Sequence, residues 1–242
     1  MSEKWLTGTV IENRHWTETL FSLRVEGAPL RYEAGQFVRI ALDINGQRVA
    51  RAFSFVNPPD DPMLEFYGVI VPEGPLSPRL AKLKAGDALY VAANPAGFLV
   101  LPEVPDAQTL WLVATGTGLA PFLSILRTPA PWRRFKNVVL VHAVRYAREL
   151  TYKEVIQATP ARYVTFVSRE GAPGSLAGRI PAAIADGRLE SAAGLPLTPQ
   201  NSHVMLCGNP QMLRDATAAL AARGMRKHRR RAPGHITVES FW

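Results

Sequence analysis

Short apolar runs separated by turn residues fill the first hundred positions of the chain. Six runs rich in Val, Ile, Leu and Phe cover residues 6–11, 20–25, 36–42, 51–56, 64–71 and 88–92. Runs of this length, bounded by turn-forming residues, are typical of β-strands. Asn45-Gly46, between the third and fourth runs, is a dipeptide favoured in two-residue hairpin loops. The pattern predicts six antiparallel strands in a small barrel or sandwich.

The pattern changes after Pro102 and Pro105. Apolar runs at residues 109–114, 138–143, 163–167 and 203–207 now alternate with helical stretches at 121–126, 149–158, 180–185 and 210–223. This alternation predicts a parallel sheet with helices on both faces, as in Rossmann-like domains. We therefore expect two domains, residues 1–101 and 107–242.

The composition is that of a globular protein with a sizeable core: the 242 residues are 47% hydrophobic and 20% charged. The first ten residues lack the apolar run of a signal peptide, and no segment approaches the ~18 consecutive apolar residues of a membrane span. Cys207 is the only cysteine, so no internal disulfide can form, and we expect a cytoplasmic protein with no membrane partner. The five histidines show no metal-ligand spacing, and we expect no bound metal.

The net charge of +8 is concentrated in one segment near the end of the chain. Six of the positive charges belong to Arg223, Arg226, Lys227, Arg229, Arg230 and Arg231. Such a cluster can bind nucleic acid, attract an acidic protein, or be an ordinary solvated segment. The basic composition therefore describes one local cluster, not a uniformly charged surface.

The tetrapeptide Arg51-Ala52-Phe53-Ser54 carries the most informative chemistry. A guanidinium pairs with phosphate, an aromatic ring covers a flat heterocycle, and a hydroxyl reaches a ring nitrogen. On a strand, Arg51 and Phe53 share a face, whereas Ser54 points away unless the strand bends. These groups suit a flavin nucleotide; an edge strand with an ordinary charged residue is the alternative.

Two helix entrances are candidate phosphate sites. Ser77 is predicted as an N-cap, with Pro78 at the first helical position, and the free N–H groups of that turn would bind an anion beside Arg51. Gly116-Thr117-Gly118 follows a strand and opens a helix, as in dinucleotide sites, although Pro121 replaces the usual third glycine. A capped surface helix that binds nothing remains the alternative for the first entrance.

No acidic residue stands where an NAD site would bind the ribose hydroxyl. The second strand of the parallel sheet runs into Arg145, the third ends in Ser168 and Arg169, and Arg179 follows. Arginines and a serine at strand ends suit a 2′-phosphate, and so NADP(H); loop arginines in solvent are the alternative. Cys207, between a strand and a helix, is either a contact for a nicotinamide ring or a buried structural thiol.

Taken together, these segments resemble the bacterial ferredoxin/flavodoxin–NADP⁺ reductases, in particular their enterobacterial-type branch. The motifs that carry the resemblance occur in the family's order: residues 51–54, 64–67, 76–80, 114–117 and 207–212, followed by an aromatic C-terminus. The resemblance implies an N-terminal FAD-binding β-barrel and a C-terminal NADP-binding α/β domain, with a terminal aromatic residue on the flavin.

The resemblance also implies roles for individual residues. Ser54, Cys207, Glu239 and Trp242 would act at the reacting atoms, with Trp242 covering the second flavin face. The FAD-binding residues would be Arg51, Ala52, Phe53, Ser54, Phe66, Tyr67, Gly68, Val69, Pro75, Leu76, Ser77, Thr117 and Trp242. The NADP-binding residues would be Gly116, Thr117, Arg145, Ser168, Arg169, Arg179, Cys207, Gly208, Asn209 and Met212.

The implied function is electron transfer between NADPH and ferredoxin or flavodoxin by way of FAD, with a hydride passing to the flavin and single electrons to the carrier. The carrier would be an acidic protein, the enzyme a monomer, and nucleic acid no partner. An NAD(P)H-dependent reductase of an oxygenase component, a free flavin or a quinone is the alternative. Two positions depart from the family: Phe53 replaces the usual Tyr, and Gly68 replaces a residue that is often bulkier.

Overall fold

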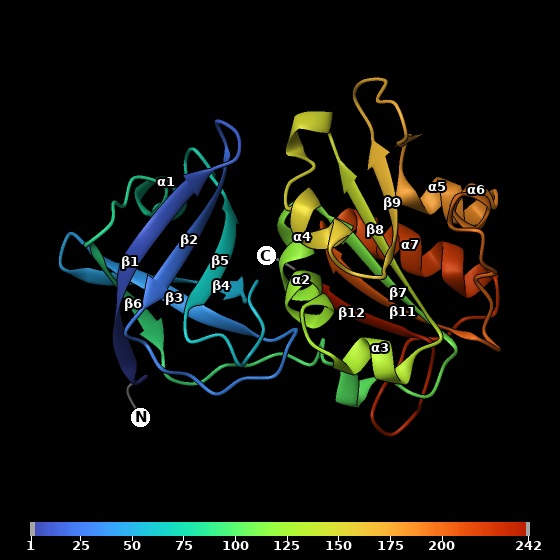
Figure 1. Cartoon of the computed structure of the whole chain (residues 1–242), viewed down its shortest axis with the longest axis horizontal. Helices are drawn as coiled ribbons and strands as arrows, with labels where there is room; N and C mark the ends of the chain where they lie inside the picture. Colours follow the sequence, from blue (N-terminus) through green and yellow to red (C-terminus); the bar gives the residue numbers. More distant parts are fainter. Residues whose placement is uncertain (1–2, 241–242) are drawn as a thin grey trace.

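The computed structural model describes residues 3–240 and contains two six-stranded sheets that lie beside each other (Figure 1). The first sheet is antiparallel, with the strand order β4-β3-β6-β1-β2-β5. Its strands are β1 (Trp5–His15), β2 (Leu20–Glu26), β3 (Phe37–Ile44), β4 (Gln47–Ser54), β5 (Leu64–Val69) and β6 (Ala88–Ala92). A bridge between Phe55 and Phe66 brings the two edge strands together, so the sheet curls into a half-barrel.

Alternation along the strands creates the core of the half-barrel. Leu23, Ile40, Phe66 and Leu89 are fully buried in one apolar cluster inside it, while the residues between them point outward. Asn45 and Gly46 take φ angles of 50° and 77° in the β3–β4 loop, the left-handed conformations that a two-residue hairpin turn of this kind requires. The six predicted strands and the hairpin are therefore confirmed.

The short helix α1 (Ser77–Leu80) begins differently from the sequence prediction. Leu76 occupies the N-cap position, and Ser77 is the first helical residue. The Ser77 hydroxyl instead accepts a hydrogen bond of 2.9 Å from the backbone N–H of Val71. The prediction of Ser77 as an N-cap is therefore wrong, because its hydroxyl fixes the preceding loop.

The second sheet is parallel throughout, with the order β10-β9-β8-β7-β11-β12. Its strands are β7 (Thr109–Thr115), β8 (Asn137–Val144), β9 (Arg162–Val167), β10 (Leu176–Ala177), β11 (Ser202–Gly208) and β12 (Ile236–Ser240). The four predicted strands are its centre. The two outer strands, β10 and β12, are not among these four predicted strands; both are short and depend on pairing with a neighbour.

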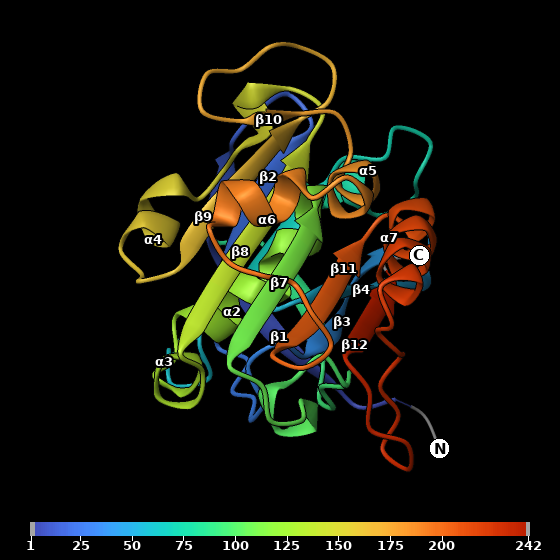
Figure 2. The same cartoon turned by 90° about the vertical axis from the view of Figure 1, so that its right-hand side faces the viewer.

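Helices cover both faces of this sheet, as the alternating pattern predicts. Figure 2 shows α5 (Ile180–Ala185), α6 (Arg188–Ala193) and α7 (Pro210–Ala222) on the face turned toward the viewer, with α2 (Ala120–Leu126) behind the sheet. Also present are α3 (Ala130–Arg134), α4 (Lys153–Gln157) and the 3-10 turns η1 (Leu101–Glu103), η2 (Gly116–Leu119) and η3 (Ala147–Glu149). No helix within residues 3–240 is long and apolar enough to cross a membrane.

One apolar cluster joins the two sheets. Leu20, Val56 and Tyr67 of the first sheet's domain pack in the same buried cluster as Phe122 and Leu123 of α2. Figure 1 shows α2 and α4 between the two sheets. Because this contact is apolar and buried, it holds the two domains together.

Candidate active site

The end of β4 presents a half-buried aromatic ring beside a glycine. Phe53 makes an edge-on contact with Phe66, their ring centroids 6.4 Å apart. A methyl group added at Gly68 would lie 2.9 Å from the rings of both Phe53 and Phe21. Glycine at this position therefore follows from the close packing of its neighbours, and a bulkier residue would displace the Phe53 ring.

Arg51 lies two residues before Phe53 on the same strand and is exposed. One nitrogen, Nη1, donates a hydrogen bond of 2.7 Å to the neighbouring carbonyl of Ala50. The remaining donors of the guanidinium face solvent and are available to a phosphate.

Ser54 ends the strand and has an unused hydroxyl. Its side chain is buried at 2% exposure, yet its Oγ has no hydrogen-bond partner among the described residues. Buried polar atoms without partners are rare in folded proteins, since each costs free energy. A polar atom of a bound ligand would satisfy this hydroxyl, and the fit supports an FAD ring at this position.

Glu239 is a second side chain with an unused buried oxygen. It lies on β12, and its Oε1 has no partner among the described residues. A methyl group added at Gly97 would lie 3.0 Å from Oε2 of Glu239 and 3.1 Å from the Phe37 ring. Because Phe37 is the register partner of Ser54, the parallel sheet places Glu239 next to the strand that ends in Ser54. Burial raises the pKa of the Glu239 carboxyl to about 7.

The raised pKa of Glu239 predicts a pH-dependent stability. The native state keeps a proton that the unfolded chain, with a carboxyl pKa of 4.5, has released, so the free energy of unfolding falls as the pH rises from 4.5 to 7. Glu239→Gln removes this loss. By urea titration of the flavin-free protein, we expect the variant's advantage to be small below pH 4.5 and about 3 kcal/mol above pH 7. A difference that does not vary with pH would contradict the buried carboxyl.

Cys207 lies opposite Glu239 on the adjacent strand. The parallel register pairs Cys207 of β11 with Glu239 of β12 and with Ala114 of β7. Its side chain is fully buried, and burial, with a smaller effect of the Glu239 charge, raises the pKa of the thiol well above its usual range. Cys207 is therefore a neutral thiol, not a thiolate nucleophile.

The glycine loop after β7 packs directly against Cys207. A methyl group added at Gly118 in η2 would lie 2.5 Å from the backbone oxygen of Cys207. Gly116 has a φ of 53°, and a methyl group there would meet no atom within 4 Å. The loop is thus tight on its inner side and open at Gly116, as a site for an approaching ligand requires.

Two residues that the sequence analysis missed fix this loop. The ring of His142 contacts the Gly116 carbonyl through Nε2 at 3.1 Å, and burial lowers the pKa of His142 to about 4. The neutral ring therefore donates from Nε2 to Gly116. Thr115 Oγ1 accepts a hydrogen bond of 2.9 Å from the backbone N–H of Asn209. His142 belongs to no motif, and Thr115 stands in the 114–117 motif but had no role predicted for it; parallel strand register brings both to the site.

Predicted NADP-binding residues in the turn after β11 also have structural roles. Gly208 has a φ of 134°, and a methyl group there would lie 2.2 Å from Thr115 Oγ1. The Asn209 side chain caps α7 by accepting from the backbone N–H groups of Gln211 and Met212. Met212 is mostly buried in the core beneath α7. The backbone of Asn209 is also engaged, since its N–H donates to Thr115 Oγ1 and its carbonyl accepts from the N–H of Leu213.

The predicted adenosine-phosphate residues lie at the carboxyl ends of β8 and β9. The backbone N–H of Arg169 donates to the Arg145 carbonyl at 2.9 Å, and the hydroxyl of Ser168 donates to Val144 at 3.2 Å. Arg145, Arg169 and Arg179 are exposed, and Arg179 follows the outer strand β10 as the N-cap residue of α5. Arg145 and Arg169 are therefore neighbours at one edge of the sheet.

Some predicted FAD residues point elsewhere. The Tyr67 side chain is buried between the domains, where Thr151 donates to its Oη at 2.9 Å, so only its backbone can face a ligand there. Leu76 is buried in the half-barrel, and the Pro75 carbonyl accepts from Arg79 at 2.7 Å. Ala52 and Val69 flank the Phe53 and Gly68 positions on their strands. Thr117 lies in η2, and Trp242 lies outside the described residues.

The fold and site define a class: an oxidoreductase in which an FAD-binding half-barrel precedes an NAD-binding parallel sheet. Residues 9–98 match the family model described as an oxidoreductase FAD-binding domain, and residues 112–218 match the model of an oxidoreductase NAD-binding domain.

Full-length relatives narrow the class. The chain is 55% identical to a flavodoxin/ferredoxin–NADP reductase of Shigella flexneri and 54% identical to one of Escherichia coli, each over 98% of this chain and 99% of the relative. A ferredoxin NADP⁺ reductase from Neisseria gonorrhoeae, solved with bound FAD and NADP, superposes over 100% of both chains with a TM-score of 0.96 at 33% identity. The chain belongs to the flavodoxin/ferredoxin–NADP reductase family.

Proposed function

We propose that this protein transfers electrons between NADPH and a ferredoxin or flavodoxin, with FAD held at the end of β4. FAD, when bound, accepts two electrons as a hydride and releases them singly. The observation that carries the proposal is the pair of buried, unpartnered oxygens, Ser54 Oγ and Glu239 Oε1. They come from different domains: Glu239 is the register partner of Cys207 on β11, and Ser54 is the register partner of Phe37 on β3. This arrangement fits a flavin ring on one side and a nicotinamide ring on the other.

The two domains divide the binding. Arg51 would hold the FAD pyrophosphate, and the Phe53 ring would cover the flavin, with Phe66 and Gly68 behind it. Gly116 and Thr117 would admit the nicotinamide toward Cys207 and Glu239. Arg145, Ser168, Arg169 and Arg179 would hold the 2′-phosphate of NADP. This division rests on their placement at the ends of β4, β7, β8 and β9.

The neutral Cys207 thiol and the Glu239 carboxyl have distinct tasks in this proposal. The thiol is a small apolar wall that holds the nicotinamide ring without attacking it. With a pKa of about 7, Glu239 can carry or release a proton near neutral pH. These roles orient the reactants; the electron chemistry belongs to the cofactors.

The basic arm, residues 226–231, is the part of the basic cluster that stays exposed. Arg223 is separate from it, because its guanidinium pairs with Glu190 and the Ile184 carbonyl. Arg230 pairs with Glu103 at 2.8 Å through Nε and lies 4.6 Å from the Phe98 ring centroid. The side chains of Arg226, Lys227, Arg229 and Arg231 are exposed. We propose that the arm attracts an acidic carrier to a monomeric, cytoplasmic enzyme; contact with the outer end of FAD is the alternative.

Neutralising the arm separates these two roles. For the triple variant Lys227→Ser, Arg229→Ser, Arg231→Ser, we expect kcat/KM for the carrier to fall about tenfold at low ionic strength, because long-range attraction is lost. The difference should vanish at high salt, and reduction of a small neutral dye should not change. A variant that loses FAD in place of carrier turnover would assign the arm to the outer end of FAD.

The direct test is a visible spectrum of the purified protein before and after anaerobic addition of NADPH. We expect a flavin spectrum that bleaches with NADPH and much less with NADH. Turnover is then compared with ferredoxin, flavodoxin, free flavin, a quinone and an oxygenase component as acceptors. A protein that remains colourless after incubation with FAD would refute the proposal. Turnover with free flavin, a quinone or an oxygenase component, but not with ferredoxin or flavodoxin, would show that the electron acceptor is a different one.

A further inference from the structure

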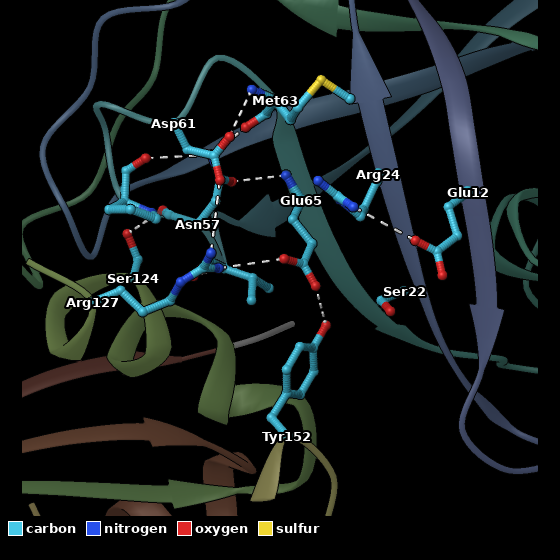
Figure 3. Close-up of polar contacts among 12 residues, drawn as sticks. Glu12, Ser22, Arg24, Asn57, Asp61, Met63, Glu65, Ser124, Arg127 and Tyr152 are labelled. Carbon is cyan, nitrogen blue, oxygen red and sulfur yellow. Dashed lines mark hydrogen bonds and ion pairs between the residues drawn. The ribbon is translucent and has the colours of Figure 1, made fainter. Parts of the chain in front are cut away.

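A buried hydrogen bond joins the two domains just behind the candidate site. Ser124 of α2 donates from its hydroxyl to the backbone carbonyl of Asn57 at 2.7 Å (Figure 3). Ser124 is 0% exposed and Asn57 1%. The Asn57 side chain in turn fixes the start of β5, because its Oδ1 accepts from the backbone N–H of Glu65 at 2.7 Å. The bond therefore ties α2 to a rigid part of the half-barrel.

A second connection runs through Glu65. Its carboxylate accepts a hydrogen bond of 2.8 Å from the Tyr152 hydroxyl and lies 3.4 Å from Nη1 of Arg127 (Figure 3). Arg127 is the C-cap residue of α2 and also pairs with Asp61 at 3.7 Å. Tyr152 is held with a φ of 56°, a strained conformation for a non-glycine residue. The surrounding contacts keep its hydroxyl aimed at Glu65.

A third connection is the hydrogen bond of 2.9 Å from Thr151 to the Tyr67 hydroxyl. Thr151 and Tyr67 are both buried, at 3% exposure each. The ring of Tyr67 also meets the ring of Tyr152 edge-on, their centroids 5.3 Å apart. Because both partners are almost fully buried, this hydrogen bond is directional and hard to replace.

These connections lie close, along the chain, to both halves of the candidate site. Asn57 follows Ser54 by three residues. Ser124 lies on the helix that continues directly from η2, and Gly118 of η2 is packed against Cys207. A shift of α2 along the half-barrel would therefore move the Gly116 loop and Cys207 relative to Phe53 and Ser54.

We propose that this set of contacts is an interdomain latch that fixes the separation of the flavin-side and nicotinamide-side residues. The latch comprises Asn57, Glu65, Tyr67, Ser124, Arg127, Thr151 and Tyr152. Its members are positioning residues: their side chains bond to one another across the seam and act through β4, η2 and β11. The inference rests on the proposed function, since hydride transfer needs the reacting atoms about 3–3.5 Å apart and about 1 Å of misplacement can slow it about a hundredfold.

The two dry hydrogen bonds carry more of this task than the ion pair. Arg127 and Glu65 border a groove of about 470 Å³ at the seam, and their side chains are 28% and 15% exposed. Water in the groove weakens and loosens such a pair. Ser124 and Asn57 do not border the groove, and Thr151, which does, is only 3% exposed. The hydroxyls of Ser124 and Thr151 are therefore the informative positions to change.

The test compares hydroxyl-removing variants with matched controls in the FAD-loaded protein. Ser124→Ala and Thr151→Val remove the two dry bonds. Thr128→Ala removes a hydroxyl at the end of the same helix that bonds only within its own domain, and Thr151→Ser keeps the hydroxyl. Tyr152→Phe is the further variant if either removal prevents folding, since it keeps the ring and loses the hydroxyl that bonds to Glu65.

Three measurements report on the effect of the latch: the rate of flavin reduction, the long-wavelength absorbance and the distance between the domains. At saturating NADPH we expect Ser124→Ala and Thr151→Val to slow flavin reduction at least tenfold, with the Kd for NADP⁺ changed less than twofold. The long-wavelength absorbance of stacked nicotinamide and flavin should weaken in parallel. Spin labels at Glu18→Cys and Ala182→Cys, one exposed site in each domain, should give one narrow distance distribution that broadens in these variants. Cys207 is buried and does not compete for label.

The outcomes separate the latch from the proposed function. Rates and distance distributions that match the controls would overturn the latch, as would a broadened distribution with an unchanged rate. A wild-type protein that NADPH does not reduce would refute the proposed function. In that case the distance distributions alone decide whether these hydroxyls fix the domains, and narrow distributions in both variants would overturn the latch.

Discussion

Replacing Ser54 with alanine is expected to slow flavin reduction by NADPH about a hundredfold while FAD stays bound. The Ser54 hydroxyl is buried and has no partner among the described residues, so its donor is free for the atom that changes charge as the hydride arrives. Removing one such preorganised donor costs roughly a hundredfold to a thousandfold in rate. Anaerobic stopped-flow absorbance of the FAD-loaded variant measures the effect directly.

Two control variants test whether the effect comes from the Ser54 hydroxyl. Ser54→Thr keeps a hydroxyl and should recover most of the rate, provided the FAD content is unchanged. Thr128→Ala removes a hydroxyl that donates to the Ile125 carbonyl within its own domain, and it should leave the rate near that of the wild type. If Ser54→Ala reacts within twofold of the wild type, the hydroxyl has no part in hydride transfer.

The second large effect is expected in nucleotide selectivity. The double variant Arg145→Ala, Arg179→Ala should lower kcat/KM for NADPH about a hundredfold and change that for NADH less than threefold. Each charge-assisted hydrogen bond to a 2′-phosphate contributes roughly 1.5–3 kcal/mol, and NADH lacks that phosphate. Steady-state reduction of a dye with both nucleotides gives the two constants.

The matched control for selectivity is Arg133→Ala. Arg133 is an exposed arginine of the same domain, but it lies on α3, before β8 begins. It should leave the preference for NADPH unchanged. An equal loss with NADPH and NADH in the double variant would mean that these arginines support the fold of the sheet edge and do not bind the phosphate.

Long regular segments were predictable from the sequence, and short dependent ones were not. Local apolar runs in the sequence predict the six antiparallel strands and the four central parallel strands. α3 has five residues that include Pro131, and α6 has six between Gly187 and Gly194, too few turns to show a helical period. β12 is a strand because it pairs with β11, a contact that neighbouring residues along the chain do not encode.

The same distinction applies to the site. Arg51, Phe53 and Ser54 could be selected because three kinds of chemistry stand within four residues. Glu239 entered only through the family resemblance, since a single acidic residue near the end of a chain carries no pattern. The roles of His142 and Thr115 were not predicted because their partners, Gly116 and Asn209, are 26 and 94 positions away. The latch was equally hidden, since its interdomain contacts join residues 62 to 87 positions apart in the sequence.

The apolar cluster that crosses from one sheet to the other limits how this protein can be recombined. Leu20, Val56 and Tyr67 complete a core most of whose other members belong to the nucleotide-binding half. In a chimera that takes that half from a distant homologue, these three side chains would pack against side chains of different size and shape. Exchanges that carry the strands bearing these residues along with α2 preserve the shared packing, and cuts made at the linker alone do not.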